Sequence, residues 1–165
     1  MIRFVIGTLL SMLVLNCAVS QDPAAAQTRT RLESIAKEIN LLSPEEGGQA
    51  ILVPNTSWLK PVTGKGDEPA DVSLADEAIY AFKDEEPATF SKIAVLINGA
   101  DDRNVKEFEL LAADDWRGEF RSVGKFTTLN ALLVKSPYQE FAFEPTKARY
   151  VKIRLLSNWV TVAMP

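Results

Sequence analysis

The stretch RYVKIRLL, residues 149–156, decides the fold class. Within it Val151, Ile153 and Leu155 alternate with two basic residues. Because successive side chains of a β-strand point to opposite faces of a sheet, this alternation predicts a strand with one buried face and one solvated face. Such a strand is typical of an antiparallel sheet whose other face packs on a second layer.

The same alternation recurs upstream, and Gly, Pro, Asn and Asp separate the segments at short intervals. Many short strands with frequent turns and little helix indicate an all-β protein, either a sandwich or a barrel. We expect Tyr80 and Phe82, on a central strand, to lie in the core. The predicted strands are 50–53, 77–83, 91–97, 105–112, 120–126, 138–143 and 148–155.

One short helix is predicted before this domain, at residues 27–40. Leu32, Ile35 and Ile39 recur there at helical spacing, and Thr30 begins a capping box. An isolated helix of this length is marginal in water, so we favour a lead-in that packs on the domain. A coiled-coil or partner-binding helix is the alternative.

The N-terminus has the features of a signal peptide. Arg3 precedes an apolar run that is too short to span a bilayer, and small residues follow it. We predict cleavage after Ser20, with residues 24–26 as a second site. The chain then divides into a signal peptide at 1–20, a lead-in at 21–40 and one domain at 41–165. An uncleaved anchor is the alternative.

Cys17 gives a second reading of the same segment, as the lipid-bearing first residue of a bacterial lipoprotein. Asn16 argues against it, because lipoprotein signals carry a small residue immediately before the cysteine. We therefore predict an exported protein, periplasmic or extracellular, with lipid attachment at Cys17 as the less favoured reading.

Composition excludes several kinds of chemistry. The chain has no histidine, and its single cysteine lies in the predicted signal peptide. Nucleophiles that need a histidine base, zinc sites built from His and Cys, and disulfide frameworks are therefore excluded from the mature chain. After cleavage, 17 basic residues would face 22 acidic ones. Nucleic acid is not expected as a partner, because it selects for basic patches.

Three segments together carry a resemblance to a known family. The first is AIYAFK, DEEPATF and SKIAVLIN at 78–98, the second is NVKEFELLAADDWRGEFRSVGKFT at 104–127, and the third is YQEFAFEPTKARYVKIRLLSN at 138–158. They resemble, in this order, the central hairpin, the strand with aromatic turn and following strand, and the closing segment of the discoidin domain, also called the coagulation factor five/eight type C domain. ARYVKI at 148–153 is the most specific piece.

The resemblance implies a galactose-binding-like jelly roll, an antiparallel β-sandwich with ligand loops at one end. Such domains are mostly non-catalytic and bind sugars, lipid head groups or protein surfaces, and the fold alone does not say which. The family often holds calcium with an Asp-Gly phrase, but here Gly66 precedes Asp67 and the phrase is absent. Asp67, Glu68 and Asp71 could supply oxygen ligands, although solvated turn acids are the more common case. We predict no metal and no cofactor.

The C-terminus departs from the family, whose members continue with a loop and a last strand that carries an acidic residue. This sequence continues only as SNWVTVAMP, in which residues 160–163 could form a short strand. The last strand is therefore predicted to be very short or absent. Because an uncovered sheet edge invites association, a homodimer through an open edge is one prediction for the partner.

Three tryptophans, Trp58, Trp116 and Trp159, fall in predicted loops or ends. Sugar sites often stack an aromatic ring on the ligand and surround it with hydrogen-bonding groups, whereas most tryptophans serve packing. Trp58 has the best claim to a ligand face, and packing over a turn is as good an explanation for Trp116. The predicted ligand-binding residues are Asn55, Trp58, Lys60, Asp67, Trp116 and Arg117.

Acidic runs at 84–86, 101–102 and 114–115 raise the alternative of a glycosidase, which needs two carboxylates facing one cleft. Acidic residues are ordinary turn formers, so we predict no catalytic residues. The predicted function is an exported, non-catalytic module that binds carbohydrate or another cell-surface ligand. The alternative is a structural or protein-interaction component of the bacterial envelope.

Overall fold

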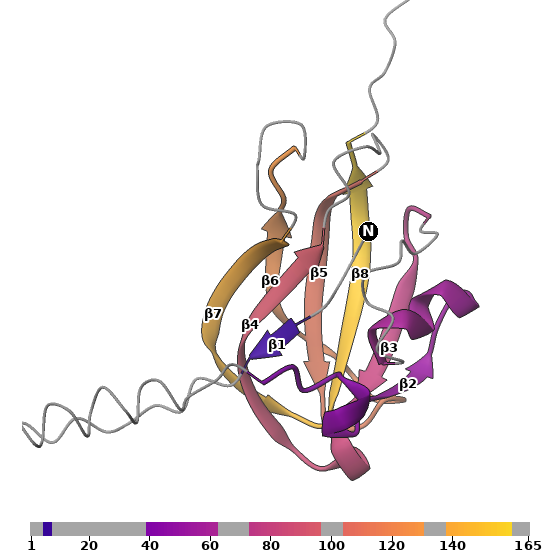
Figure 1. Ribbon diagram of the computed structural model, residues 1–165, viewed down its shortest axis with the longest axis vertical. Helices are drawn as coiled ribbons and strands as arrows, with labels where there is room; N and C mark the ends of the chain where they lie inside the picture. The colour runs from indigo at the N-terminus through magenta and orange to yellow at the C-terminus, as the bar shows by residue number, and fades with distance from the viewer. Residues whose placement is uncertain (1–4, 8–38, 63–72, 97–103, 131–137, 160–165) are drawn as a thin grey trace, which may run out of the picture.

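The computed structural model describes residues 5–7, 39–62, 73–96, 104–130 and 138–159 (Figure 1). Eight strands and three short 3-10 helices make up the described part. The strands are β1 (Val5–Gly7), β2 (Gln49–Leu52), β3 (Glu77–Ala81), β4 (Ala88–Leu96), β5 (Val105–Ala113), β6 (Arg121–Thr127), β7 (Tyr138–Ala148) and β8 (Tyr150–Asn158). The 3-10 helices are η1 (Pro44–Glu46), η2 (Thr56–Val62) and η3 (Lys83–Glu85).

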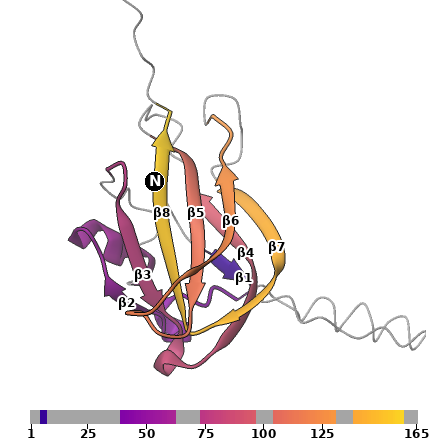
Figure 2. The same ribbon diagram turned by 180° about the vertical axis from the view of Figure 1, so that it is seen from behind.

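The strands form two antiparallel sheets packed face to face (Figures 1 and 2). The larger sheet has the order β2-β3-β8-β5-β6 and the smaller one the order β1-β4-β7. Every strand pairing is antiparallel. The predicted antiparallel β-sandwich is therefore confirmed.

The strand that predicted the fold lies at the centre of the larger sheet. β8 pairs with β3 on one side and β5 on the other. Val151 and Ile153 are fully buried between the sheets, whereas Lys152 and Arg154 lie on the outer face and are only partly buried. The alternation of apolar and basic residues in the sequence thus corresponds to the two faces of the sheet.

Aromatic side chains close one side of the sandwich, where β6 of the larger sheet approaches β7 of the smaller one (Figure 2). The ring of Phe126 lies 5.3 Å from that of Phe141 and 5.9 Å from that of Phe143, measured between centroids. Phe108 on β5 adds contacts at 5.4 Å to Phe126 and 5.5 Å to Phe141. These tilted and edge-on contacts join the two sheets through apolar burial.

The segment that contains η1, β2 and η2 contributes to the same core. Leu42 and Trp58 from this segment are buried with Tyr80, and the hydroxyl of Tyr80 donates a hydrogen bond of 2.9 Å to the carbonyl oxygen of Trp58. Tyr80 and Phe82 are 0% and 2% exposed, so their predicted place in the core is confirmed.

A single residue, Arg149, links β7 of the smaller sheet to β8 of the larger one. Its backbone N–H donates to the carbonyl of Ala113, at the end of β5. Its own carbonyl accepts from the N–H of Phe82, which follows β3. Both main-chain groups of this corner residue are therefore paired with other parts of the larger sheet.

Several sequence predictions change in detail. β4 begins three residues before the predicted strand and β7 continues to Ala148, through Pro145, which an edge position tolerates. β1 lies inside the segment predicted to be a signal peptide. Most of the predicted helix at 27–40, and the short strand considered at 160–163, lie outside the described residues. Within the described part, none of the helices has the length and apolar character needed to cross a membrane.

Candidate functional site

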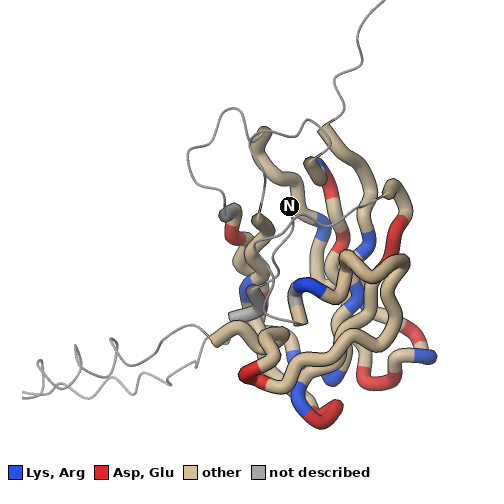
Figure 3. The backbone as a smooth tube through the Cα atoms, turned by 45° about the vertical axis from the view of Figure 1, so that its right-hand side comes forward, with Lys and Arg blue, Asp and Glu red and all other residues tan. Residues whose placement is uncertain are grey.

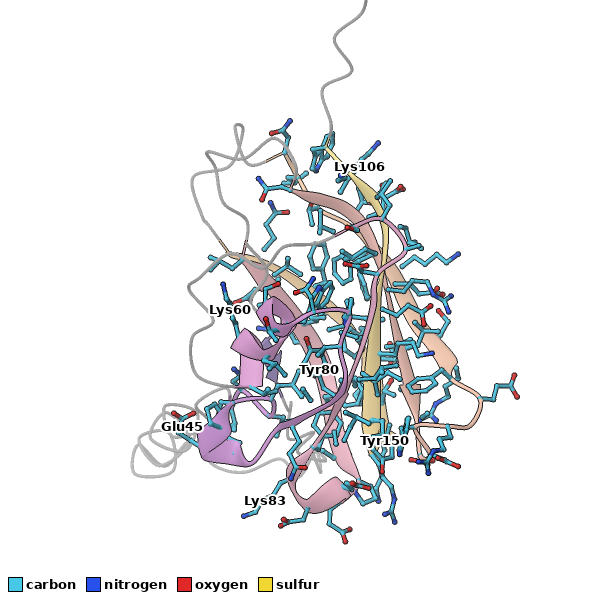
Figure 4. All side chains as sticks on the ribbon, turned by 90° about the vertical axis from the view of Figure 1, so that its right-hand side faces the viewer. Glu45, Lys60, Tyr80, Lys83, Lys106 and Tyr150 are labelled. Atoms are coloured by element: carbon cyan, nitrogen blue, oxygen red, sulfur yellow. The ribbon has the colours of Figure 1, made fainter. Side chains whose placement is uncertain are left out.

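The sandwich has two ends that carry different side chains (Figure 4). We call the upper end the one where β5 begins and β6 and β8 end, since Val105 pairs with Asn158 and Glu107 with Thr127. The lower end is the one where β5 ends and β8 begins, because Ala113 pairs with Tyr150. In Figure 4, Lys106 lies at the upper end and Lys83 and Tyr150 lie towards the lower one.

The first group of predicted site residues lies at and before η2. Asn55 is exposed, and its side-chain oxygen accepts hydrogen bonds from the backbone N–H and the hydroxyl of Ser57, at 2.9 and 2.5 Å. Asn55 therefore closes the turn that begins η2, which is a common role for asparagine. Lys60 lies further along η2 and is partly buried, whereas Asp67 lies outside the described residues.

Trp58 requires a correction. We expected its ring to face a ligand from a loop, but the side chain is 1% exposed and belongs to the core shared by the two sheets. The 3-10 turn of η2 directs this residue inward, and burial of so large an apolar surface stabilises that placement. Its ring is therefore not accessible for stacking on a sugar in this structure.

The second group lies at the lower end, in the turn between β5 and β6. Trp116 is partly buried and packs against a small apolar cluster of Ile79, Ala81 and Tyr150. The guanidinium carbon of Arg117 lies 4.2 Å from the centroid of the Trp116 ring. The structure thus brings Trp116 and Arg117 together. The Trp116 ring both packs on the apolar cluster and contacts the Arg117 guanidinium group.

The acidic turn that contains η3 also lies at the lower end, where Figure 3 shows charged residues on the turns. Asp84 and Glu85 both adopt left-handed backbone conformations, with φ of 52° and 57°. The hydroxyl of Tyr150 donates to the carboxylate of Glu85, and Arg149 donates to its carbonyl oxygen. The hydrogen bond to Glu85, followed by burial and the charges of Glu85 and Asp115, raises the pKa of Tyr150. These contacts fix the shape of the turn.

At the upper end the structure fixes a tryptophan that the predicted site did not include. Trp159 follows β8 directly, and its side chain is partly exposed. Its indole N–H donates to the hydroxyl of Thr128 at 3.0 Å, and its backbone N–H donates to the carbonyl of Asn104 at 2.8 Å. The ammonium of Lys106 lies 5.1 Å from the ring centroid. Asn104 before β5, Lys106 on β5 and Thr128 after β6 therefore all contact Trp159.

Thr128, which supports Trp159, is buried, and its hydroxyl makes two hydrogen bonds. Thr128 is 0% exposed, and its hydroxyl donates to the carbonyl of Val105 at 2.6 Å while it accepts from Trp159. Its neighbour Leu129 is held by Gln139, whose amide group accepts from the Leu129 N–H and donates to the Leu129 carbonyl. Leu129 itself is 63% exposed. An exposed apolar residue thus follows the residue that supports the aromatic ring.

Sequence reasoning noted Trp159 but could not place its partners. Lys106, Thr128 and Trp159 are far apart in the chain and meet only because β6 and β8 both flank β5. The order of strands in a sheet depends on long-range pairing, which periodicity does not show. The available signal was the position of a tryptophan immediately after the clearest strand.

The described part of the chain contains no group of three His, Cys, Asp or Glu residues arranged to hold a metal ion. No family model matches the sequence, and no curated protein matches it.

Solved structures give the comparison that bears on the fold. The family 32 carbohydrate-binding module from Streptococcus pneumoniae EndoD is 15% identical, over 72% of this chain and 88% of that one, with a TM-score of 0.53. The chain has a galactose-binding-like fold. The family 32 module of AlyQ, solved with 4,5-unsaturated mannuronic acid, is 16% identical over 67% and 81% of the two chains, with a TM-score of 0.50.

A third structure, a Clostridium perfringens family 32 module of CpGH89 in complex with GalNAc-β-1,3-galactose, is 19% identical with a TM-score of 0.43. The match covers 53% of this chain and 58% of that one, so this chain spans little more than half the length of that structure. The galactose-binding-like fold confirms the resemblance to the discoidin domain found in the sequence. At these identities the likeness concerns the fold alone.

Proposed function

We propose that this protein is an exported, non-catalytic module that binds carbohydrate at its upper end, on the surface formed by Trp159, Lys106 and Leu129. The galactose-binding-like fold, which it shares with carbohydrate-binding modules, supports the class of function. The observation that carries the site is the fixed position of Trp159, whose indole N–H and backbone N–H each donate a hydrogen bond to a neighbouring segment while its side chain stays partly exposed.

The chemistry of this surface suits a sugar. The apolar faces of a sugar ring stack on aromatic side chains, and the surrounding hydroxyl groups need hydrogen-bond donors and acceptors. Lys106 supplies three donors beside the ring. Because Thr128 and Asn104 already hold Trp159, binding would cost little side-chain ordering.

Export rests on the signal-peptide features of residues 1–20, with a periplasmic or extracellular location. The absence of histidine from the sequence, together with the solvent exposure of the acidic turns at the lower end, supports a binding function over catalysis. Trp116 and Arg117 form a second candidate surface, because they are the predicted site residues that contact each other near the molecular surface.

A glycan array followed by calorimetry on the best ligand tests the proposal. Trp159→Ala should weaken binding at least about ten-fold, which corresponds to about 1.4 kcal/mol. Trp116→Ala, at the opposite end, is the matched control and should leave the affinity unchanged. Trp159→Phe keeps an aromatic face and should recover part of the affinity. Thermal melting of each variant separates loss of binding from loss of folding.

The outcomes distinguish the candidate surfaces. If Trp116→Ala abolishes binding and Trp159→Ala does not, the ligand occupies the lower end. If no glycan binds the wild-type protein, carbohydrate recognition is excluded and the alternative gains support, namely a structural or protein-interaction component of the envelope. The sequence also predicts a homodimer through an open sheet edge. Such a dimer would suit a structural component of the envelope and is also compatible with carbohydrate binding.

A further inference from the structure

The smaller sheet is completed by a strand that the exported protein is expected to lose. β1 pairs antiparallel with β4, with Val5 opposite Ala94, Ile6 opposite Ile93 and Gly7 opposite Lys92 (Figure 1). β1 lies within residues 1–20, which we expect to be cleaved after Ser20. Cleavage would leave β4 at the edge of the smaller sheet, with its other side paired to β7.

The edge that remains would be long and poorly protected. β4 reads ATFSKIAVL, nine residues with a single charge and neither proline nor glycine. Natural sheets protect their edges with charges, prolines, bulges or covering segments, because an open edge pairs with other strands. The one charged residue, Lys92, forms an ion pair of 3.1 Å with Glu140 on β7.

The smaller layer would also be thin. Without β1 it contains only β4 and β7 among the described strands, facing a sheet of five. Two-stranded sheets are marginal without further packing. A strand added to β4 would pair the backbone groups that β1 pairs now and restore the layer.

We propose that a second copy of this chain occupies the β4 edge of the exported protein, with the two β4 strands antiparallel about a two-fold axis at Ile93. Lys92 of one copy then lies opposite Ala94 of the other, as Gly7 and Val5 lie opposite these residues in β1. The two small sheets become one continuous sheet of four strands in the order β7-β4-β4-β7.

Two observations are compatible with a second copy at this edge. The pairing that β1 makes is antiparallel and centred on Ile93, which is the geometry that a two-fold axis requires of two identical strands. The charges also permit a dimer. Each Lys92 keeps its ion pair with Glu140 of the same copy, so the interface does not bring two uncompensated lysines together.

Light scattering on the exported protein, with its N-terminus determined by mass spectrometry, tests the proposal. The expected result is cleavage after Ser20, twice the monomer mass and slow hydrogen exchange at residues 92–94. A peptide of sequence IRFVIGTL, residues 2–9, should compete for the edge and shift the dimer towards monomer, whereas its scrambled version should not.

Ala94→Lys is the informative variant, because it places a lysine opposite Lys92 of the second copy and should weaken the dimer at least about ten-fold. Ala142→Lys is the control, since it brings a lysine opposite Lys92 within one copy, on β7 and away from the β4 edge. Ala94 is 3% exposed and Ala142 is exposed, so thermal melting of both variants separates loss of the dimer from loss of folding. A monomer at every concentration, a retained N-terminus that protects residues 92–94, or a dimer unaffected by Ala94→Lys would each overturn the proposal. None of these results bears on carbohydrate binding at Trp159.

Discussion

The hydroxyl group of Tyr80, on β3, donates a hydrogen bond of 2.9 Å to the carbonyl oxygen of Trp58, in η2. Both residues are buried, at 0% and 1% exposed. Burial raises the pKa of Tyr80 far above its ordinary value, so the hydroxyl stays protonated and remains a donor at every physiological pH. The bond ties the η2 segment to the larger sheet.

Tyr80→Phe should lower the free energy of unfolding by about 1–2 kcal/mol, because the buried carbonyl of Trp58 loses this donor. Tyr150→Phe is the matched control, since its hydroxyl donates to the exposed Glu85 at the lower end and its loss should cost less. Urea denaturation measures both. Equal losses in the two variants would contradict the structural role given to the Tyr80 bond.

Gly48 lies where no side chain fits. A Cβ atom added there would lie 2.5 Å from the carbonyl oxygen of Leu42, which is backbone and cannot turn aside. Gly48→Ala should therefore destabilise the protein by about 1–3 kcal/mol. Gly118→Ala is the control, because its nearest neighbour would be 3.4 Å away, and its thermal melting should match the wild type.

Thr128 should act on ligand binding through Trp159. Thr128→Val removes the hydroxyl that holds the indole N–H and leaves the carbonyl of Val105 without that donor, so stability should fall by about 1–3 kcal/mol. The affinity for the glycan found on the array should fall several-fold at a temperature where the variant is folded. Thr127→Val, at the exposed neighbouring position, should change neither quantity.

Glu77 should contribute to the acid sensitivity of the fold. Burial opposes its charged form, but the hydrogen bonds and charges of Arg154 and Lys152 outweigh this and lower the pKa of Glu77 below its ordinary value of 4.5. A carboxyl whose pKa is lowered on folding stabilises the protein above the unfolded pKa, and this contribution is lost as the pH falls through the folded pKa.

Glu77→Gln should therefore cost stability at pH 7 and make the loss of stability below about pH 4.5 less steep. The pair is partly exposed and screened by water, so the effect should be about 1 kcal/mol or less. Denaturation midpoints measured from pH 7 to pH 3 check the slope, with the exposed Glu86→Gln as control. A wild-type slope in Glu77→Gln would contradict the role of this group.

The strands could be predicted because their signal is local. The alternation in RYVKIRLL needs no knowledge of the rest of the chain, and the buried face of β8 is the one it indicates. Trp58 could not be placed in the same way. Its neighbours Pro54, Asn55 and Ser57 are typical of a surface turn, and only the packing of that turn against Tyr80 and the core makes the tryptophan a core residue.

The candidate site depended on more distant information. Trp159, Thr128 and Lys106 meet because three strands lie in the order β8-β5-β6, and this order arises from pairings between residues dozens of positions apart. Trp116 and Arg117 were easier to associate, because they are adjacent in the sequence. The contact between these two residues required no knowledge of the sheet.

The single-residue corner at Arg149 bears on how the protein opens. One residue spans about 3.5 Å. The smaller sheet, which contains β7, therefore cannot move away from the larger sheet without pulling on β8, the central strand of the larger sheet. Amide exchange at Val151 and Ile153 in β8 should therefore occur at the same rate as exchange at Gln139 and Phe141, which pair with β4 from β7, with both governed by global unfolding. Force applied to β7 would be transmitted to β8 through one residue, and the two sheets should unfold cooperatively rather than peel apart.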